Sequence, residues 1–151
     1  MLDLVPPIHR ATHRIGLYLA AADRHGLTQG EAHILALLAP RGTAPLAELQ
    51  KGLAHKPSTL TSILNRLVAR GLVTRTAGRD DRRTFVIATT VKGRAAAREV
   101  AKQIGALERA VRARVTPADV AGFQAVVAAV EQEAAARAGV RIFRGRAHAA
   151  P

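Results

Sequence analysis

The chain has 151 residues, with 23 Lys or Arg against 11 Asp or Glu, and its formal net charge is +12. This length allows one buried core but not two independent domains, and the lack of cysteine excludes disulfides, thiolate metal sites and thiol redox switches. No apolar run approaches the ~20 residues that cross a bilayer and no export signal is evident, so we expect a cytoplasmic protein with no membrane partner.

The first part of the chain has the apolar spacing of helices. Apolar residues recur at three- and four-residue steps from Leu4 to Ala22, which predicts a first helix of about 20 residues. Thr28 followed by Glu31 has the spacing of a capping box and opens a second helix, which ends before Pro40.

Two further helices are expected in the middle of the chain. A short third helix runs from Pro45 to about Gly52, and a fourth runs from Pro57 to Gly71. The predicted buried stripe of the fourth helix consists of Leu60, Ile63, Leu64, Leu67 and Val68.

Beyond the fourth helix the apolar period changes. Residues 72–73 and 85–87 are two β-prone runs that flank a polar stretch, which predicts a β-hairpin with a long tip. The helical period resumes at about Val91 and continues to Val111, and a last helix begins at Thr116 and Pro117. Residues 139–151 form a basic tail.

Short helices followed by a hairpin are the order of a winged helix-turn-helix, in which the second motif helix enters the DNA major groove. Hydroxyl, amide and guanidinium groups are suited to hydrogen bonds with base edges and phosphates. A solvated helix face is the alternative, although it would more often carry Glu, Lys and Ala. Outside the buried stripe, the fourth helix presents Ser58, Thr59, Thr61, Ser62, Asn65 and Arg66.

The charge distribution also favours DNA. From Lys51 to Arg98 there are eleven Lys or Arg against two Asp, a local balance of +9, and a localised positive patch is typical of DNA binding. An Arg on the hairpin tip, residues 77–83, would suit the minor groove, with a neighbouring carboxylate to hold it. The alternatives are an Arg-rich solvated surface and an ordinary loop of mixed charge.

Residues 27–97 resemble the MarR (multiple antibiotic resistance regulator) family of winged-helix repressors. The resemblance rests on LTQGEAHILALL, on STLTSILNRLVARGLV and, most specifically, on DRRTFVIATTVKGR. The family pattern in the last segment is Asp, any residue, Arg, five residues and Leu-Thr, with Gly shortly after. This chain has Asp81 and Arg83, then Thr89 where Leu is usual, then Thr90 and Gly93.

The resemblance implies a mainly α fold with a small β-hairpin wing and dimerisation helices at both ends of the chain. Residues 1–138 would form a single unit, with the DNA-binding region at 28–90, dimerisation helices at 1–26 and 91–138, and the tail at 139–151. Arg83 would contact the minor groove, Asp81 would orient it and Arg82 would contact phosphate. The full set of expected DNA-binding residues is Lys56, Ser58, Thr59, Thr61, Ser62, Asn65, Arg66, Arg79, Asp81, Arg82 and Arg83.

We therefore expect a sequence-specific transcriptional regulator, a repressor that binds a pseudo-palindromic operator in double-stranded DNA as a homodimer. The resemblance further implies a small anionic or phenolic effector, with His13, Tyr18 and His33 as its candidate lining residues. A nonspecific architectural DNA-binding protein is the alternative that the high charge and the basic tail leave open.

Two other classes find less support. His9, His13 and His33 have a spacing that suits a shared metal ion, but the fifth helix supplies no further His or Cys, so we expect neither a metal nor another cofactor. An enzyme is not expected, because the chain lacks a Cys nucleophile, a Gly-rich phosphate loop and a metalloprotease motif, and no orienting carboxylate is evident beside His55 and Ser58.

Overall fold

The computed structural model of the chain describes residues 2–53, 56–78 and 84–138. The chain divides into two compact units, Met1–Glu108 and Arg109–Pro151. The boundary lies inside the fifth helix, so that helix belongs to both units.

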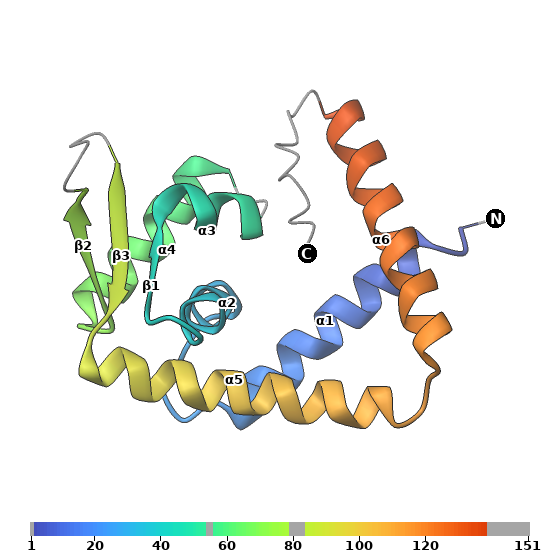
Figure 1. Cartoon of the computed structure of the whole chain (residues 1–151), viewed down its shortest axis with the longest axis horizontal. Helices are drawn as coiled ribbons and strands as arrows, with labels where there is room; N and C mark the ends of the chain where they lie inside the picture. Colours follow the sequence, from blue (N-terminus) through green and yellow to red (C-terminus); the bar gives the residue numbers. More distant parts are fainter. Residues whose placement is uncertain (1, 54–55, 79–83, 139–151) are drawn as a thin grey trace, which may run out of the picture. The chain divides into compact units, whose positions relative to one another are not determined.

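The described residues form a mainly helical fold with a small sheet (Figure 1), as the sequence predicts. The order of elements is α1 (Val5–Ala22), α2 (Gln29–Leu38), β1 (Thr43–Pro45), α3 (Leu46–Leu53), α4 (Pro57–Ala69), β2 (Val73–Ala77), β3 (Phe85–Thr89), α5 (Val91–Arg112) and α6 (Pro117–Arg137).

The helix boundaries follow the capping residues. The Thr28 side chain accepts a hydrogen bond from the main-chain N–H of Glu31, and the Glu31 carboxylate accepts one from the N–H of Thr28, so the predicted capping box of α2 is confirmed. Pro57 occupies the first turn of α4, where no N–H is needed, and Gly71 follows its end with a left-handed φ of 66°.

The sheet is antiparallel, with the strand order β1-β3-β2 (Figure 1). The predicted hairpin is confirmed as β2 and β3, which pair from Val73 opposite Thr89 to Ala77 opposite Phe85. The third strand, β1, is absent from the sequence prediction. It adds only three residues to the other edge of β3.

The core lies where α2, α3 and α4 pack on this sheet and on the start of α5. Four of the five residues predicted for the α4 stripe are buried, but Val68 is 42% exposed, so its assignment to the core is wrong. Val68 lies at the edge of the stripe, near the C-terminal end of the helix. The fully buried large apolar side chains are Ile34, Leu35, Leu38, Leu49, Leu60, Leu64, Leu67, Leu72, Val73 and Ile87.

The start of α5 is fastened to the end of α4. The Thr90 hydroxyl donates to the main-chain oxygen of Gly71 at 2.7 Å and accepts from the N–H of Gly93 at 2.9 Å. A Cβ atom at Gly93 would lie 1.7 Å from the main-chain oxygen of Leu72, so only glycine fits there. The glycine of the DRRTFVIATTVKGR segment therefore allows α5 to cross the backbone at the base of the hairpin.

Thr89, which departs from the family pattern, is buried at the same junction. Its hydroxyl donates to the main-chain oxygen of Gly42 at 3.1 Å, and its N–H donates to the same oxygen at 2.8 Å. A leucine could not make the first of these bonds. Compared with leucine, the threonine has less apolar packing, but its hydroxyl adds a second hydrogen bond between the hairpin and the turn before β1.

The helices near the chain ends bury little within the described residues. α1 has no buried residue, and Leu4, Ile15 and Leu17 are exposed. In the second unit, α6 begins with a capping box between Thr116 and Asp119 and likewise has no buried residue. None of the described helices is long and apolar enough to cross a membrane.

Candidate nucleic-acid interface

The outer face of α4 is polar, as the sequence predicts. Because Leu60, Leu64 and Leu67 turn one side of this helix into the core, the residues between them remain outside. Lys56, immediately before the helix, is exposed as well. The exposed polar residues of the helix are Ser58, Thr59, Thr61, Ser62, Asn65 and Arg66.

Part of this face borders an open hollow between α4 and the start of α2. Ser58, Thr59, Ser62 and Arg66 line it from α4, and Thr28 lines it from the other side. Hydroxyls and a guanidinium that share a concave surface are suited to hydrogen bonds with a polar, negatively charged partner.

Three of the six residues, Thr61, Ser62 and Arg66, also have partners within the protein. The Thr61 hydroxyl donates to the main-chain oxygen of Pro57 at 2.9 Å, which leaves its lone pairs to accept from a ligand. Arg66 donates from Nε to Glu31 Oε1 at 3.2 Å and from a terminal nitrogen to Ser62 Oγ at 3.1 Å. The Arg66 guanidinium is therefore held in place before any ligand arrives.

Sequence reasoning missed the carboxylate that holds Arg66. Glu31 is 1% exposed, and it also accepts from Arg70 at 3.0 Å and from the N–H of Thr28 at 2.8 Å. Burial by itself would raise the pKa of Glu31, but these hydrogen bonds and the Arg70 charge together hold the pKa below its ordinary value. Glu31 is thus a buried carboxylate that stays ionised.

The predicted wing contacts Arg79, Asp81, Arg82 and Arg83 lie outside the described residues. On the β2–β3 hairpin that leads to the wing tip, the Arg75 guanidinium lies 3.9 Å from the centre of the Phe85 ring, in cation–π contact across the hairpin. Arg75 was not predicted as a site residue. The alternation of the two strands was the available signal, since Phe85 lies two residues from Ile87, the partner of Arg75, and therefore on the same face of the hairpin.

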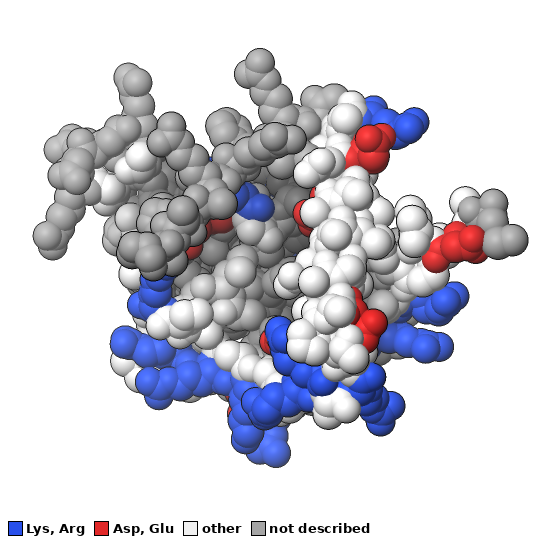
Figure 2. Space-filling model, turned by 45° about the vertical axis from the view of Figure 1, so that its right-hand side comes forward, with Lys and Arg blue, Asp and Glu red and all other residues white. Residues whose placement is uncertain are grey.

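The positive charge is not confined to α4 and the wing. Lys and Arg side chains gather along the lower edge in Figure 2, the edge that α5 follows in Figure 1. On α5, Lys92, Arg94, Arg98 and Lys102 are exposed. Three of them belong to the basic stretch of residues 51–98, so the charge excess that the sequence places in one segment is divided between two surfaces.

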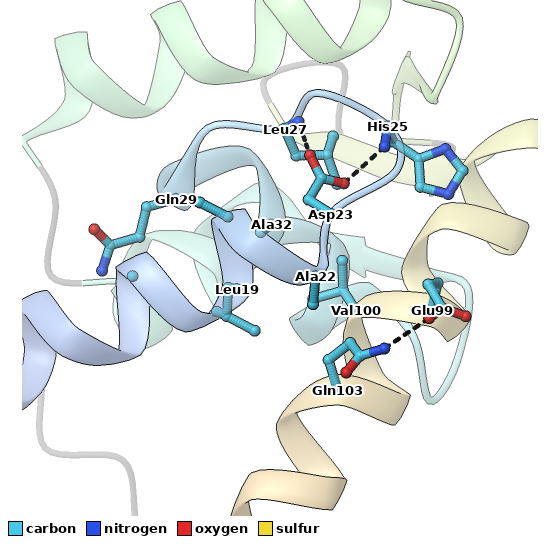
Figure 3. A pocket seen from close by; sticks show the side chains of 12 residues that line it. Leu19, Ala22, Asp23, His25, Leu27, Gln29, Ala32, Glu99, Val100 and Gln103 are labelled. Carbon is cyan, nitrogen blue, oxygen red and sulfur yellow. Dashed lines mark hydrogen bonds between the residues drawn. The ribbon is translucent and has the colours of Figure 1, made fainter.

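A small cavity lies between α1, α2 and α5 (Figure 3), with a volume of about 30 Å³. This is room for roughly one water molecule. Its polar lining comes from the turn after α1, with Asp23 and His25, from α2, with Gln29, and from α5, with Glu99 and Gln103. In Figure 3 the Gln103 amide donates to Glu99, at 2.8 Å.

The three residues proposed for effector binding do not line this cavity. His13 and His33 are exposed on their helices, whereas Tyr18 is half-buried next to it. The Tyr18 hydroxyl lies 3.2 Å from the main-chain oxygen and from Oε1 of Gln103, so Tyr18 touches a residue of the cavity wall. Among the described residues, no group of three His, Cys, Asp or Glu is arranged to hold a metal ion.

Helices α2 to α4 with the β2–β3 hairpin define a winged helix-turn-helix, in which α4 occupies the position of the recognition helix. The model of the MarR family matches residues 27–85, which is the winged-helix part of the chain. The resemblance found in the sequence is thereby confirmed.

Known relatives agree with this assignment. The chain is 29% identical over 75 residues to the HTH-type transcriptional repressor MdtR of Bacillus subtilis; that match covers 50% of this chain and 48% of MdtR, so the aligned part spans about half of the relative. A probable transcriptional regulator from Pseudomonas aeruginosa has a similar structure, with 25% identity, a TM-score of 0.66, and coverage of 85% of this chain and 97% of the other. Both are named as regulators of transcription and neither as an enzyme.

A second similar structure comes from a protein whose DNA binding is controlled by a ligand. It is Bordetella bronchiseptica BpsR, with 21% identity, a TM-score of 0.69, and coverage of 86% of this chain and 94% of that one. The DNA binding of BpsR is regulated by 6-hydroxynicotinic acid. At this level of identity the likeness supports the fold of the chain alone.

Proposed function

We propose that this protein is a sequence-specific DNA-binding regulator of transcription, a repressor that binds a pseudo-palindromic operator as a homodimer. The observation that carries the proposal is the outer face of α4, where six polar residues stand exposed at the recognition-helix position. Ser58, Asn65 and Arg66 are of the kinds that read base edges or bind phosphates. MdtR, the similar protein of Bacillus subtilis, is a repressor, and this supports the repressor role.

The homodimer is supported by the apolar surface of the end helices. Ile15 is 43% exposed in the first unit, and Phe123 is 62% exposed in the second. Neither α1 nor α6 buries a residue within the described chain, and such apolar faces are typical of helices that pack between subunits. Two recognition helices related by a two-fold axis would then face successive major grooves.

The first test separates base reading from phosphate binding. We expect the protein to prefer the duplex upstream of its own coding region over a scrambled duplex, with binding that weakens steeply as salt is added. Asn65→Ala should weaken binding to the upstream duplex about tenfold and hardly affect the scrambled duplex. Lys56→Ala should weaken both and reduce the salt slope by about one. Fluorescence anisotropy in a salt series measures all of these values.

Equal affinity of the wild type for the two duplexes would contradict sequence-specific regulation and favour the architectural alternative. Arg83→Ala in the same series tests the wing contact that the family resemblance implies. It should weaken binding to the upstream duplex by a similar factor if the wing enters the minor groove.

The second test concerns the dimer. Ile15→Glu places a charge on the apolar stripe of α1 and should weaken self-association about tenfold or more, because the carboxylate would lose its water in the interface. His13→Glu adds the same charge to the opposite side of α1 and should leave the dimer intact. Sedimentation equilibrium measures both. A monomeric wild type would exclude the proposed two-fold operator complex.

Release by a small effector is a second proposal, and it rests on the cavity between α1, α2 and α5. Because its volume is about 30 Å³, an aromatic ligand would have to separate these helices. We expect 6-hydroxynicotinic acid, or a phenolic acid of similar size, to lower affinity for the upstream duplex. If none of these acids changes the affinity for the upstream duplex, the effector proposal is wrong.

A further inference from the structure

Arg66 and Arg70 of the fourth-helix segment share a single buried carboxylate. Glu31 receives Arg66 Nε on Oε1 at 3.2 Å and an Arg70 nitrogen on Oε2 at 3.0 Å. The two arginines lie one helical turn apart, with Arg66 near the end of α4 and Arg70 as its C-cap. One group on α2 thus fixes the last turn of the recognition helix.

The two arginines extend this link in opposite directions. The Arg66 side chain is 48% exposed and holds Ser62 Oγ at 3.1 Å, so it reaches the polar face of α4. Arg70 is less exposed, and it donates to the main-chain oxygens of Gly26, at 3.1 Å, and His25. These oxygens belong to the turn between α1 and α2, defined here as residues 23–27.

This turn is itself ordered by one side chain. The Asp23 carboxylate accepts from the main-chain N–H of His25 at 2.8 Å and from that of Leu27, as Figure 3 shows. Asp23, His25 and Leu27 also line the cavity between α1, α2 and α5. A continuous set of hydrogen bonds therefore runs from the cavity wall through Arg70 and Glu31 to the exposed Arg66 guanidinium.

We propose that Glu31 is a positioning residue for DNA recognition, which fixes the Arg66 guanidinium on the DNA-facing side of α4 and ties it through Arg70 to the turn of residues 23–27. The proposal rests on the proposed DNA-binding function. Arg66 has five N–H groups, of which Glu31 and Ser62 take two, so the rest are available to DNA from a fixed position. A guanidinium held in advance loses less conformational freedom on binding and tolerates fewer arrangements of its partner.

The charge of Glu31 makes the proposal distinguishable from a role in folding alone. Removing a carboxylate near DNA strengthens general electrostatic attraction, whereas freeing Arg66 weakens discrimination between sequences. Glu31→Gln should therefore lower the preference for the upstream over the scrambled duplex about tenfold, with affinity for the scrambled duplex equal or higher. Partial unfolding would instead reduce both affinities in parallel.

The experiment measures both affinities by anisotropy for the wild type, Glu31→Gln, Arg70→Gln, the double variant and Glu48→Gln. Glu48 is the matched control, since it is also a carboxylate paired with an arginine, Arg41, but on the surface. We expect Glu48→Gln to keep the preference within about twofold. Arg70→Gln should lower it as Glu31→Gln does, and the double variant should lose no more than either single one, because one unit is broken in all three.

An unchanged preference in Glu31→Gln, parallel losses on both duplexes, or additive losses in the double variant would each overturn the proposal. If the wild type does not discriminate between the two duplexes, the proposed function is wrong and the positioning role with it.

A measurement without DNA guards against a poorly folded variant. Exchange of the Arg66 Nε–H proton, followed by NMR in the wild type and Arg70→Gln, should be faster in the variant, and equal rates would count against the link.

Discussion

Replacement of Gly93 by alanine is expected to destabilise the protein by about 3 kcal/mol, at the upper end of the range for overpacking. The added Cβ would lie 1.7 Å from the main-chain oxygen of Leu72 and 2.7 Å from its carbonyl carbon. A flexible side chain could move aside, but here the obstacle is backbone at the base of β2. Either α5 or the hairpin must shift. The hydrogen bonds of the Thr90 hydroxyl with Gly71 and Gly93 would then be strained. Urea unfolding followed by circular dichroism measures the loss.

The control for Gly93 is Gly122, in the interior of α6. Apart from the adjacent residues and the backbone of its own helix, no described atom lies within 4 Å of a Cβ placed there, so Gly122→Ala should be neutral or stabilise by up to about 1 kcal/mol through helix propensity. Both variants must be compared with the wild type at one protein concentration, since dimer formation contributes to apparent stability. A Gly93→Ala protein as stable as the wild type would show that the crossing of α5 over Leu72 is looser than described.

The fold was largely predictable because its signals are local. Thr28 and Glu31 lie three residues apart, and the apolar period of α4 and the change of period after Gly71 can be read within short windows. β1 escapes this reading for a physical reason. It has three residues, of which only Ala44 is buried, so it has no period of its own and exists only because β3 offers it an edge.

The exposed residues of the candidate site could be predicted from the sequence, but their contacts with the rest of the protein could not. The six α4 residues that remain when the predicted buried positions are removed are all exposed. The one error is Val68, which was predicted to be buried but is exposed at the edge of the stripe. The pairing of Arg66 with Glu31 joins residues 35 positions apart, and no periodicity links them. For the same reason the cavity and its lining by the turn of residues 23–27 could not be read from the sequence, and the candidate effector residues His13 and His33 are not part of that lining.

Glu31 takes part in both kinds of interaction: it caps the start of α2 together with Thr28, and it pairs with Arg66 and Arg70 at the end of α4. We expect Glu31→Gln to destabilise the protein by about 2 kcal/mol at about pH 7, less than the 3–5 kcal/mol for a fully buried pair, because both arginines are partly exposed. Glutamine keeps the size of the side chain and one oxygen for the N–H of Thr28. The loss therefore reports the two charged contacts rather than a cavity.

The dependence of this loss on pH follows from the lowered pKa of Glu31. A carboxyl whose pKa is lower in the folded than in the unfolded state contributes fully above the unfolded value, and that contribution is lost as the pH falls through the folded value. The difference in unfolding free energy between wild type and Glu31→Gln should thus be large at about pH 7 and shrink as the pH falls below about 4. Urea unfolding of both proteins across this range measures it. Glu48→Gln, at the surface, should show a difference within about 0.5 kcal/mol at every pH. A constant difference between wild type and Glu31→Gln would mean that shape and hydrogen bonding, rather than the ionised carboxylate, hold the recognition helix on α2.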